Sequence, residues 1–235
     1  MSKKVVAVIP ARIDSSRFPA KMIADETGKP LIQYAWEVAN AAKTVSDVFI
    51  ATDSDDIAEV CRTFGAVVIM TGEHPNGTSR IAEAVQNLEC DVVVNMQGDE
   101  PELDPAVIDA TVEALGENVM ATAACSLQEE EFANENVVKA IVENGLAVDF
   151  TREAIEGSLR HIGLYVYQPE FLQTYVGMQP TQNEITRRLE QMRAIDNGFQ
   201  IAVAMVEPQP GGIDTRDQYD DFVARMRVWY GPGTP

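Results

Sequence analysis

Three cationic side chains gather on the first loop of this sequence. Arg12, Arg17 and Lys21 follow directly after the apolar residues 5–9, in a chain with 18 lysines and arginines against 37 aspartates and glutamates. A cationic loop at the carboxyl end of the first strand of an α/β sheet is a common place for a polyphosphate. The loop therefore predicts a phosphate site, or alternatively a solvated loop whose charges serve solubility. We expect this loop to be exposed and to contribute little to packing.

Two aspartates lie at positions suited to a metal ion. Asp99 follows the apolar residues 92–96 within the turn-like segment 97–101, and Asp214 precedes the last predicted helix within residues 211–215. A carboxylate at the carboxyl end of a strand is well placed to hold Mg²⁺ on a phosphate. Either residue could instead stabilise a turn or cap a helix.

The sequence does not favour a nucleophilic enzyme or a nicotinamide dehydrogenase. Ser15 and Ser16 lie in the cationic loop, but no His/Asp arrangement supports a nucleophile, so we expect them to donate to phosphate. The loop is neither a Walker A nor a GxGxxG motif. His161 is one of only two histidines, and a lone histidine is more often structural than catalytic.

The first half of the chain alternates between strand and helix signals. Apolar runs predict strands over residues 5–9, 48–51, 67–70, 92–96 and 119–125. Helical spacing predicts helices over residues 31–42, 55–64, 81–88 and 105–115, with Asp53, Ser54 or Asp55 capping the second and Pro105 beginning the fourth. Nearly continuous apolar strands separated by amphipathic helices predict an α/β fold with a mostly parallel sheet covered on both faces.

The second half is richer in β-strand signals. Residues 137–142 and 146–150 predict an antiparallel hairpin around Asn144 and Gly145. Strands are predicted over residues 161–167 and 201–206. One helix is predicted with Ile185, Leu189, Met192 and Ile195 on its buried face, and another near the carboxyl terminus over residues 219–230. We therefore expect one domain over residues 1–235, with a small β-rich insertion over roughly 128–182.

Composition narrows the possible partners and location. The net charge of −19 argues against nucleic acid or an anionic membrane surface as a partner. No apolar run approaches the length of a membrane span. Met1-Ser2-Lys3-Lys4 leads directly into a strand, which leaves no room for a signal peptide, and Cys61, Cys90 and Cys125 form no CxxC pair. These features predict a cytoplasmic protein with reduced thiols.

A series of segments along nearly the whole chain resembles the CMP-Kdo synthetases (3-deoxy-manno-octulosonate cytidylyltransferases). They are Ile9-Pro-Ala-Arg12, Ser16-Arg-Phe-Pro-Ala-Lys21, Gly28-Lys-Pro-Leu-Ile-Gln33, Ala51-Thr-Asp53, Asn76-Gly-Thr-Ser-Arg80, Val94-Asn-Met-Gln-Gly-Asp-Glu-Pro101, Arg160-His-Ile-Gly-Leu-Tyr165, Leu189-Glu-Gln-Met-Arg193 and Gly212-Ile-Asp-Thr215. The resemblance implies a Rossmann-like nucleotidyltransferase fold and a homodimer. It also implies a Mg²⁺-dependent enzyme of lipopolysaccharide biosynthesis that transfers CMP from CTP to a hydroxyl of Kdo and releases pyrophosphate.

The same resemblance implies roles for individual residues. Catalysis would involve Arg12, Lys21 and Asp99, and Mg²⁺ would be bound by Asp99 and Asp214. The nucleotide would contact Pro10, Ala11, Arg12, Ser15, Ser16, Arg17, Lys21, Thr78, Ser79, Arg80, Gln97 and Gly98. The acceptor would contact Arg152, Arg160, His161, Tyr165, Glu184 and Arg187. The hydroxyl of the acceptor attacks the α-phosphorus itself, so catalysis consists of positioning and charge neutralisation.

Several positions depart from the pattern of that family. Ala20 and Ser79 replace a usual glycine and a usual acidic residue, Arg187 stands at a usual acidic position, and the loop before Leu159 is short. These departures leave open a smaller, more anionic acceptor, such as phosphonoformate in phosphonate biosynthesis. A non-catalytic nucleotide-binding protein on the same fold is a further alternative.

Overall fold

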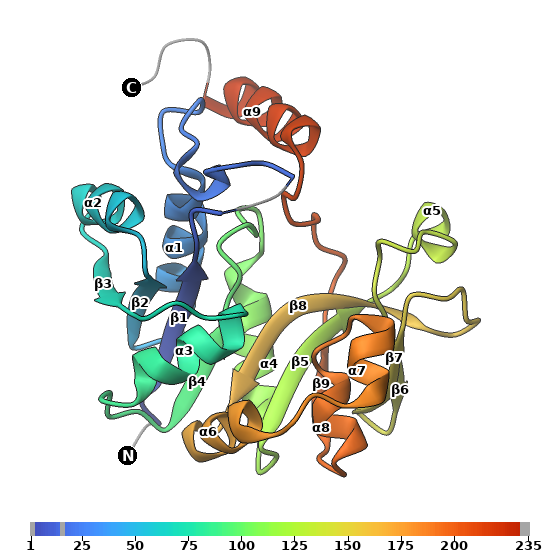
Figure 1. Ribbon diagram of the computed structural model, residues 1–235. Coiled ribbons are helices and arrows are strands. Elements are labelled where there is room, and N and C mark those ends of the chain that lie inside the picture. Colours follow the sequence, from blue (N-terminus) through green and yellow to red (C-terminus); the bar gives the residue numbers. More distant parts are fainter. Residues whose placement is uncertain (1–2, 15–16, 231–235) are drawn as a thin grey trace.

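A nine-stranded sheet runs through the computed structural model, which describes residues 3–14 and 17–230 (Figure 1). The strands lie in the order β3-β2-β1-β4-β8-β5-β9-β7-β6. Their bounds are β1 Val5–Ala11, β2 Asp47–Thr52, β3 Val67–Met70, β4 Val92–Asn95, β5 Met120–Cys125, β6 Lys139–Glu143, β7 Leu146–Thr151, β8 Leu159–Tyr167 and β9 Ile201–Met205. Every strand that the sequence predicted is present.

The sheet is mixed, so the prediction of a mostly parallel sheet is wrong for its second half. Strands β3, β2, β1 and β4 are parallel neighbours, and β5 pairs in parallel with β9. Strand β8 lies between β4 and β5 and runs antiparallel to both. This strand comes from the segment predicted as an insertion, so that segment contributes to the centre of the sheet. The hairpin β6–β7 extends the antiparallel part at one edge.

Helices cover both faces of the sheet, as predicted. Their bounds are α1 Leu31–Ala41, α2 Asp55–Thr63, α3 Gly77–Val85, α4 Pro105–Leu115, α5 Glu129–Phe132, α6 Pro169–Gly177, α7 Gln182–Arg187, α8 Met192–Asp196 and α9 Arg216–Tyr230. Side chains of β1 alternate between two buried clusters, one with α1, α2 and α4 and the other with α3, α6 and α8. None of these helices is long and apolar enough to cross a membrane in the part of the chain that the structure describes.

Local sequence signals place the ends of several elements correctly. Ser54 caps α2 by accepting the Ile57 N–H, and Asp104 caps α4, which begins at Pro105. Asn144 and Gly145 both have positive φ, of 51° and 78°, as the two-residue turn of the β6–β7 hairpin requires.

The single helix predicted through Ile185 and Ile195 is two short helices in the structure. Arg188 ends α7 in the left-handed conformation (φ 55°, ψ 48°), and the chain turns before α8 begins. The break also removes Ile185 from the buried face, since 61% of this residue is exposed. Helix α6 was not predicted, although Pro169 at its first turn and the buried Phe171 and Tyr175 are the usual signals.

Ala20 lies in the left-handed region, with φ 56° and ψ 23°, immediately before the short 3₁₀ turn Lys21–Ile23. Its N–H donates to the Ile13 carbonyl at 3.2 Å, and its own carbonyl accepts from Ile23 at 3.0 Å. The turn therefore holds an L-residue in a conformation that costs it about 1 kcal/mol. This conformation determines where Lys21 leaves the loop.

We predict that Ala20→Gly raises the free energy of unfolding by about 0.5 kcal/mol, because relief of the left-handed conformation exceeds the added entropy of the unfolded chain. Ala24→Gly is the matched control, since Ala24 has φ −64° in the same loop. The control should lower the free energy of unfolding by about 0.5 kcal/mol. Urea denaturation of both variants measures the difference, and equal losses would show that Ala20 is not strained.

Candidate active site

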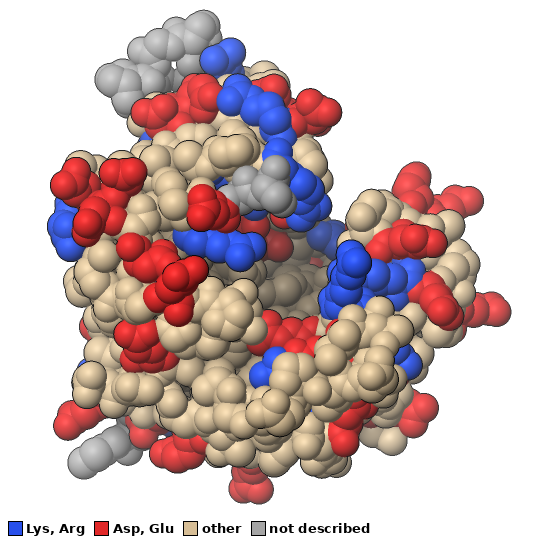
Figure 2. Space-filling view, viewed as in Figure 1, with Lys and Arg blue, Asp and Glu red and all other residues tan. Residues whose placement is uncertain are grey.

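A cavity of about 270 Å³ lies where β1 and β4 end. Strand β1 supplies Pro10 and Ala11 to its wall, and the residues after β4 supply Gln97 and Asp99. The remaining lining residues are Arg12, Asp14, Arg17, Lys21, Met22, His74, Pro75, Asn76, Gly77, Arg80 and Asp214. On this face of the molecule, basic side chains gather around a central hollow, while acidic side chains cover much of the outer surface (Figure 2).

Lys21 is the electrostatic centre of this cavity. Its ammonium nitrogen lies 2.7 Å from Asp99 Oδ2 and 3.5 Å from Asp214 Oδ1, and it donates to the Ile213 carbonyl at 2.6 Å. Only 5% of Lys21 is exposed, which contradicts the expectation of an exposed loop with little packing. One buried cation therefore joins the first loop, the segment after β4 and the segment before α9.

Two further cationic side chains, Arg12 and Arg17, line the cavity. Arg17 pairs with Asp214 at 3.0 Å, and its side chain is largely exposed. Arg12 is also exposed and has no ion-pair partner among the described residues. Together with Lys21, these two guanidinium groups suit the oxygens of a polyphosphate. Ser15 and Ser16 lie outside the described residues.

Close backbone packing holds the two aspartates together. The Ile213 N–H donates to the Asp99 carbonyl at 2.8 Å. A Cβ at Gly212 would lie 3.0 Å from Glu100 Oε1 and 3.3 Å from the Asp99 carbonyl, so a side chain there would crowd both residues. Burial raises the pKa of Glu100 to about 8, and Asp99 adds to this shift while Arg160 and Lys21 oppose it.

The pair of carboxylates fits a magnesium ion. In the described residues there is no group of three histidine, cysteine or acidic side chains that could hold a metal by itself. Mg²⁺ does not need one, because it is commonly held by one or two carboxylates together with substrate phosphates and water. Asp99 and Asp214 both approach the same ammonium group, so both are within reach of a single cation.

Of the other residues predicted to bind the nucleotide, Arg80 and Gln97 line this cavity, whereas Thr78, Ser79 and Gly98 do not. Arg80 is buried and bonds to Asp53 at 2.8 Å and to the Thr71 hydroxyl at 2.6 Å, which fastens α3 to β2 and β3. Gly98 lies under the cavity, where a Cβ would meet Met22 Sδ at 3.0 Å. Thr78 is buried in α3, and the Ser79 N–H donates to the Asn76 cap at 2.9 Å.

A second cavity, of about 630 Å³, adjoins the first and shares Pro75 and Asn76 with it. Its polar lining includes Ser79 from α3 and, from the α7–α8 region, Glu184, Arg188, Glu190 and Arg193. Glu184, predicted on the acceptor side, accepts from Arg193 Nε at 2.8 Å. Glu190 was not predicted, although it lies within the matched segment 189–193.

Glu190 carries an unsatisfied polar atom. Its Oε1 is buried and has no hydrogen-bond partner among the residues that the structure describes. Burial raises the pKa of Glu190, while a hydrogen bond from the Thr78 side chain opposes the shift. A buried acceptor without a partner is costly, so its position beside a cavity points to a ligand that donates to it.

The remaining predicted acceptor residues line neither cavity. Arg187 donates to Asp149 Oδ1 at 2.6 Å and to the Phe150 carbonyl at 2.9 Å, which ties α7 to β7. Arg152 donates to the carbonyls of Glu135 and Asn136. Arg160 donates to the Gln209 carbonyl at 2.6 Å and lies beside Gly211, in the segment that leads to Asp214.

His161 and Tyr165 lie on β8 with their rings 5.4 Å apart. The His161 Nε2 lies 2.9 Å from the Thr122 hydroxyl, which itself reaches the Leu164 carbonyl at 2.8 Å. Because the hydroxyl donates to that carbonyl, it accepts from an Nε2–H. Burial lowers the pKa of His161 to about 3, so the ring is neutral at physiological pH.

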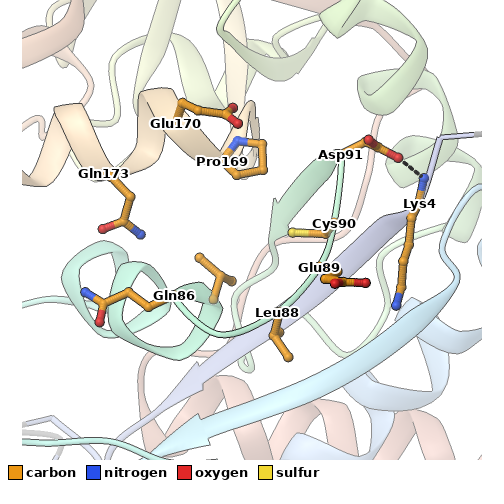
Figure 3. A pocket seen from close by; sticks show the side chains of 10 residues that line it. Lys4, Gln86, Leu88, Glu89, Cys90, Asp91, Pro169, Glu170 and Gln173 are labelled. Carbon is orange, nitrogen blue, oxygen red and sulfur yellow. Dashed lines mark hydrogen bonds between the residues drawn. The ribbon is translucent and has the colours of Figure 1, made fainter.

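A third surface cavity, of about 670 Å³, lies at the other end of the sheet (Figure 3). Lys4 and Asp91 precede β1 and β4, and the Lys4 N–H donates to Asp91 Oδ2 at 2.7 Å. Glu89, Cys90 and Glu170 also line this cavity. None of the described residues that the sequence predicted for the site lines this cavity.

Comparison with known proteins points to one family. The family model described as "Cytidylyltransferase" matches residues 6–201. A mitochondrial 3-deoxy-manno-octulosonate cytidylyltransferase of Arabidopsis thaliana is 40% identical over 95% of this chain and 83% of its own length. The 3-deoxy-manno-octulosonate cytidylyltransferase of Geobacter sulfurreducens is 36% identical over 95% of this chain and 99% of its own length. A solved structure of CMP:2-keto-3-deoxy-manno-octonic acid synthetase complexed with CTP superposes with a TM-score of 0.92 at 32% identity, covering 96% and 99% of the two chains.

We predict that Lys21→Met lowers the free energy of unfolding by roughly 2 kcal/mol, because Asp99 loses its ion pair with Lys21 and Asp214 keeps only its pair with the exposed Arg17. Binding of CTP should weaken by more than tenfold, since the buried donor to phosphate is lost as well. Urea denaturation and titration calorimetry measure the two effects. Lys29→Met is the control on the half-exposed ion pair with Glu37. A free energy of unfolding equal to wild type in Lys21→Met would contradict the buried network.

We predict that His161 makes stability fall as the pH falls below about 6.5. The unfolded chain binds a proton near that pH, whereas the folded chain does so only near pH 3, so acid favours the unfolded state. His161→Gln removes this contribution while it keeps a donor to Thr122. The difference in free energy of unfolding between the two proteins should therefore shrink from pH 7 to pH 4. Parallel curves over that range would show that His161 titrates normally.

Proposed function

Because the chain belongs to the cytidylyltransferase family, we propose that it transfers CMP from CTP to the anomeric hydroxyl of Kdo and releases pyrophosphate. The observation that carries this proposal is the shared contact of Lys21 with Asp99 and Asp214 in a cavity at the ends of β1 and β4. The relatives named for Kdo span nearly the whole chain, which supports this acceptor.

The triphosphate binds against the cationic loop. Arg12 and Arg17 project from the loop after β1, and Lys21 projects from the 3₁₀ turn that follows it. Their positive charges neutralise the phosphate oxygens and hold the α-phosphorus in place for attack. The backbone strain at Ala20 belongs to this arrangement, since it directs Lys21 into the cavity.

Mg²⁺ would be held by Asp99 and Asp214, and when bound it would stabilise the negative charge on the phosphate oxygens. Without a cation, two carboxylates on one wall of the cavity oppose a triphosphate. Lys21 satisfies them only in part, because Asp214 is also shared with Arg17 and is half-exposed.

No covalent intermediate on the protein is needed for this reaction. The acceptor hydroxyl attacks the α-phosphorus directly, so the protein positions two substrates and neutralises charge. The second cavity adjoins the first through Pro75 and Asn76 and receives the acceptor, with Glu184 and Glu190 on its wall. Arg152, Arg160, His161 and Tyr165 would support the acceptor side from β8 and its neighbours.

Specific contacts argue against the two alternative functions. A compact anionic acceptor such as phosphonoformate was suggested by Arg187, but this side chain is bound to Asp149 and the Phe150 carbonyl. A non-catalytic protein would have no need to keep Lys21, Asp99 and Asp214 in one network.

A homodimer formed through the segment 128–182 also belongs to this proposal. The hairpin β6–β7 lies at the edge of the sheet, and Val148 on β7 and Phe132 on α5 are exposed apolar side chains. Light scattering coupled to gel filtration tests the homodimer, and a monomeric mass at micromolar concentration would contradict it.

We predict that the purified chain releases pyrophosphate from CTP when both Kdo and Mg²⁺ are present. Asp99→Asn should reduce this turnover at least a hundredfold, because a carboxylate next to the α-phosphate is lost. Asp56→Asn is the matched control on the exposed surface of α2 and should behave as wild type. Release of pyrophosphate from ATP at a comparable rate, or with phosphonoformate and not with Kdo, would overturn the proposed function.

A further inference from the structure

Arg188 occupies a strained position beside the second cavity. It is one of three residues other than glycine with positive φ in the described part of the chain, and its conformation creates the break between α7 and α8. Such strain at the wall of a cavity is a reason to ask what the side chain does there. Arg188 lines this cavity together with Glu190, Glu184 and Arg193.

The other arginines near this cavity already have partners. Arg193 is bound by Glu184, Arg187 by Asp149, and Arg80 by Asp53. Arg188 is exposed and has no ion pair or hydrogen bond to any side chain among the described residues. The cavity thus contains one guanidinium group without a partner and, at Glu190 Oε1, one buried acceptor without a partner.

These two groups complement a chain of hydroxyl groups. A hydroxyl can donate to the Glu190 oxygen, and its own oxygen can accept from a guanidinium, which only donates. We propose that Arg188 determines acceptor specificity by donating hydrogen bonds to the hydroxyl groups of the acceptor that lie farthest from the attacked phosphate. The inference rests on the proposed function, since it assumes an acidic sugar in this cavity.

The connectivity of the acceptor explains why its far end lies here. In a 2-keto-3-deoxy sugar acid, the attacking hydroxyl and the carboxylate are attached to the same carbon. That carbon must approach the α-phosphorus in the first cavity, near Lys21 and Asp99. The rest of the sugar then extends past Pro75 and Asn76 into the second cavity, where Arg188 and Glu190 lie.

Two acceptors of different length test this inference. Kdo has eight carbons, and the six-carbon 2-keto-3-deoxy acid lacks the two terminal hydroxyl-bearing carbons. Arg188→Asn removes the guanidinium and keeps a residue that tolerates the left-handed conformation. It should lower kcat/KM for Kdo about tenfold through a higher KM, as expected for loss of a charged hydrogen bond. The value for the six-carbon acid, or its inhibition constant against Kdo, should stay within twofold of wild type.

Controls separate this contact from folding and from the proposed function. Arg188→Lys should recover part of the loss. Arg62→Gln, on the exposed surface of α2, should leave kcat/KM unchanged for both acceptors. The KM for CTP should be unchanged in Arg188→Asn, which shows an intact nucleotide site. Equal losses with both acceptors, or no loss with Kdo, would overturn the role of Arg188 while the proposed function stands. No turnover of Kdo by the wild-type protein would overturn both.

Discussion

The site depends on one buried ammonium group. Lys21 is the point at which three distant segments of the chain meet, since Asp99, Ile213 and Asp214 all contact its Nζ. A lysine with 5% of its surface exposed is stable only because these oxygens replace water. The strained turn at Ala20, the close approach at Gly212 and the docking of α9 all serve to keep these contacts in place.

Helix α9 holds the loop from the outside. Phe18 packs on Tyr219 with ring centroids 5.3 Å apart, and the Tyr219 hydroxyl accepts from the Glu26 N–H at 3.0 Å. Arg216 lies over both rings and pairs with Glu26. The aromatic contact therefore couples the cationic loop to the segment that carries Asp214, so the two sides of the first cavity are positioned together.

The sequence predicted the elements well where the signal is local. Strand periodicity, the Ser54 and Pro105 helix starts and the Asn144-Gly145 turn depend on residues within a few positions of each other. The reversed direction of β8 depends on pairing with strands far away in the chain, which periodicity does not encode. The helix break at Arg188 was missed because a left-handed arginine has no sequence signal, and its position changed which residues face the cavity.

The candidate site likewise divides into features that the sequence predicted and features that depend on long-range contacts. The cationic loop and the two aspartates line one cavity, because the carboxyl ends of parallel strands meet at one edge of the sheet. Tertiary contacts alone determine three other features: the burial of Lys21, the hydrogen bond from Arg187 to Asp149 and the unsatisfied oxygen of Glu190. Acceptor recognition was therefore the part of the site that the sequence described least well.

Binding of CTP measured by calorimetry with and without Mg²⁺ tests the role of the carboxylates most directly. If Asp99 and Asp214 oppose the triphosphate until a divalent cation joins them, as proposed, Mg²⁺ should strengthen the binding of CTP to the wild-type protein. Asp99→Asn removes part of that repulsion. We predict that it binds CTP more tightly than wild type without Mg²⁺ and more weakly with it. A variant that is weaker in both conditions, or unchanged in both, would contradict the proposed balance between Lys21, the carboxylates and the metal.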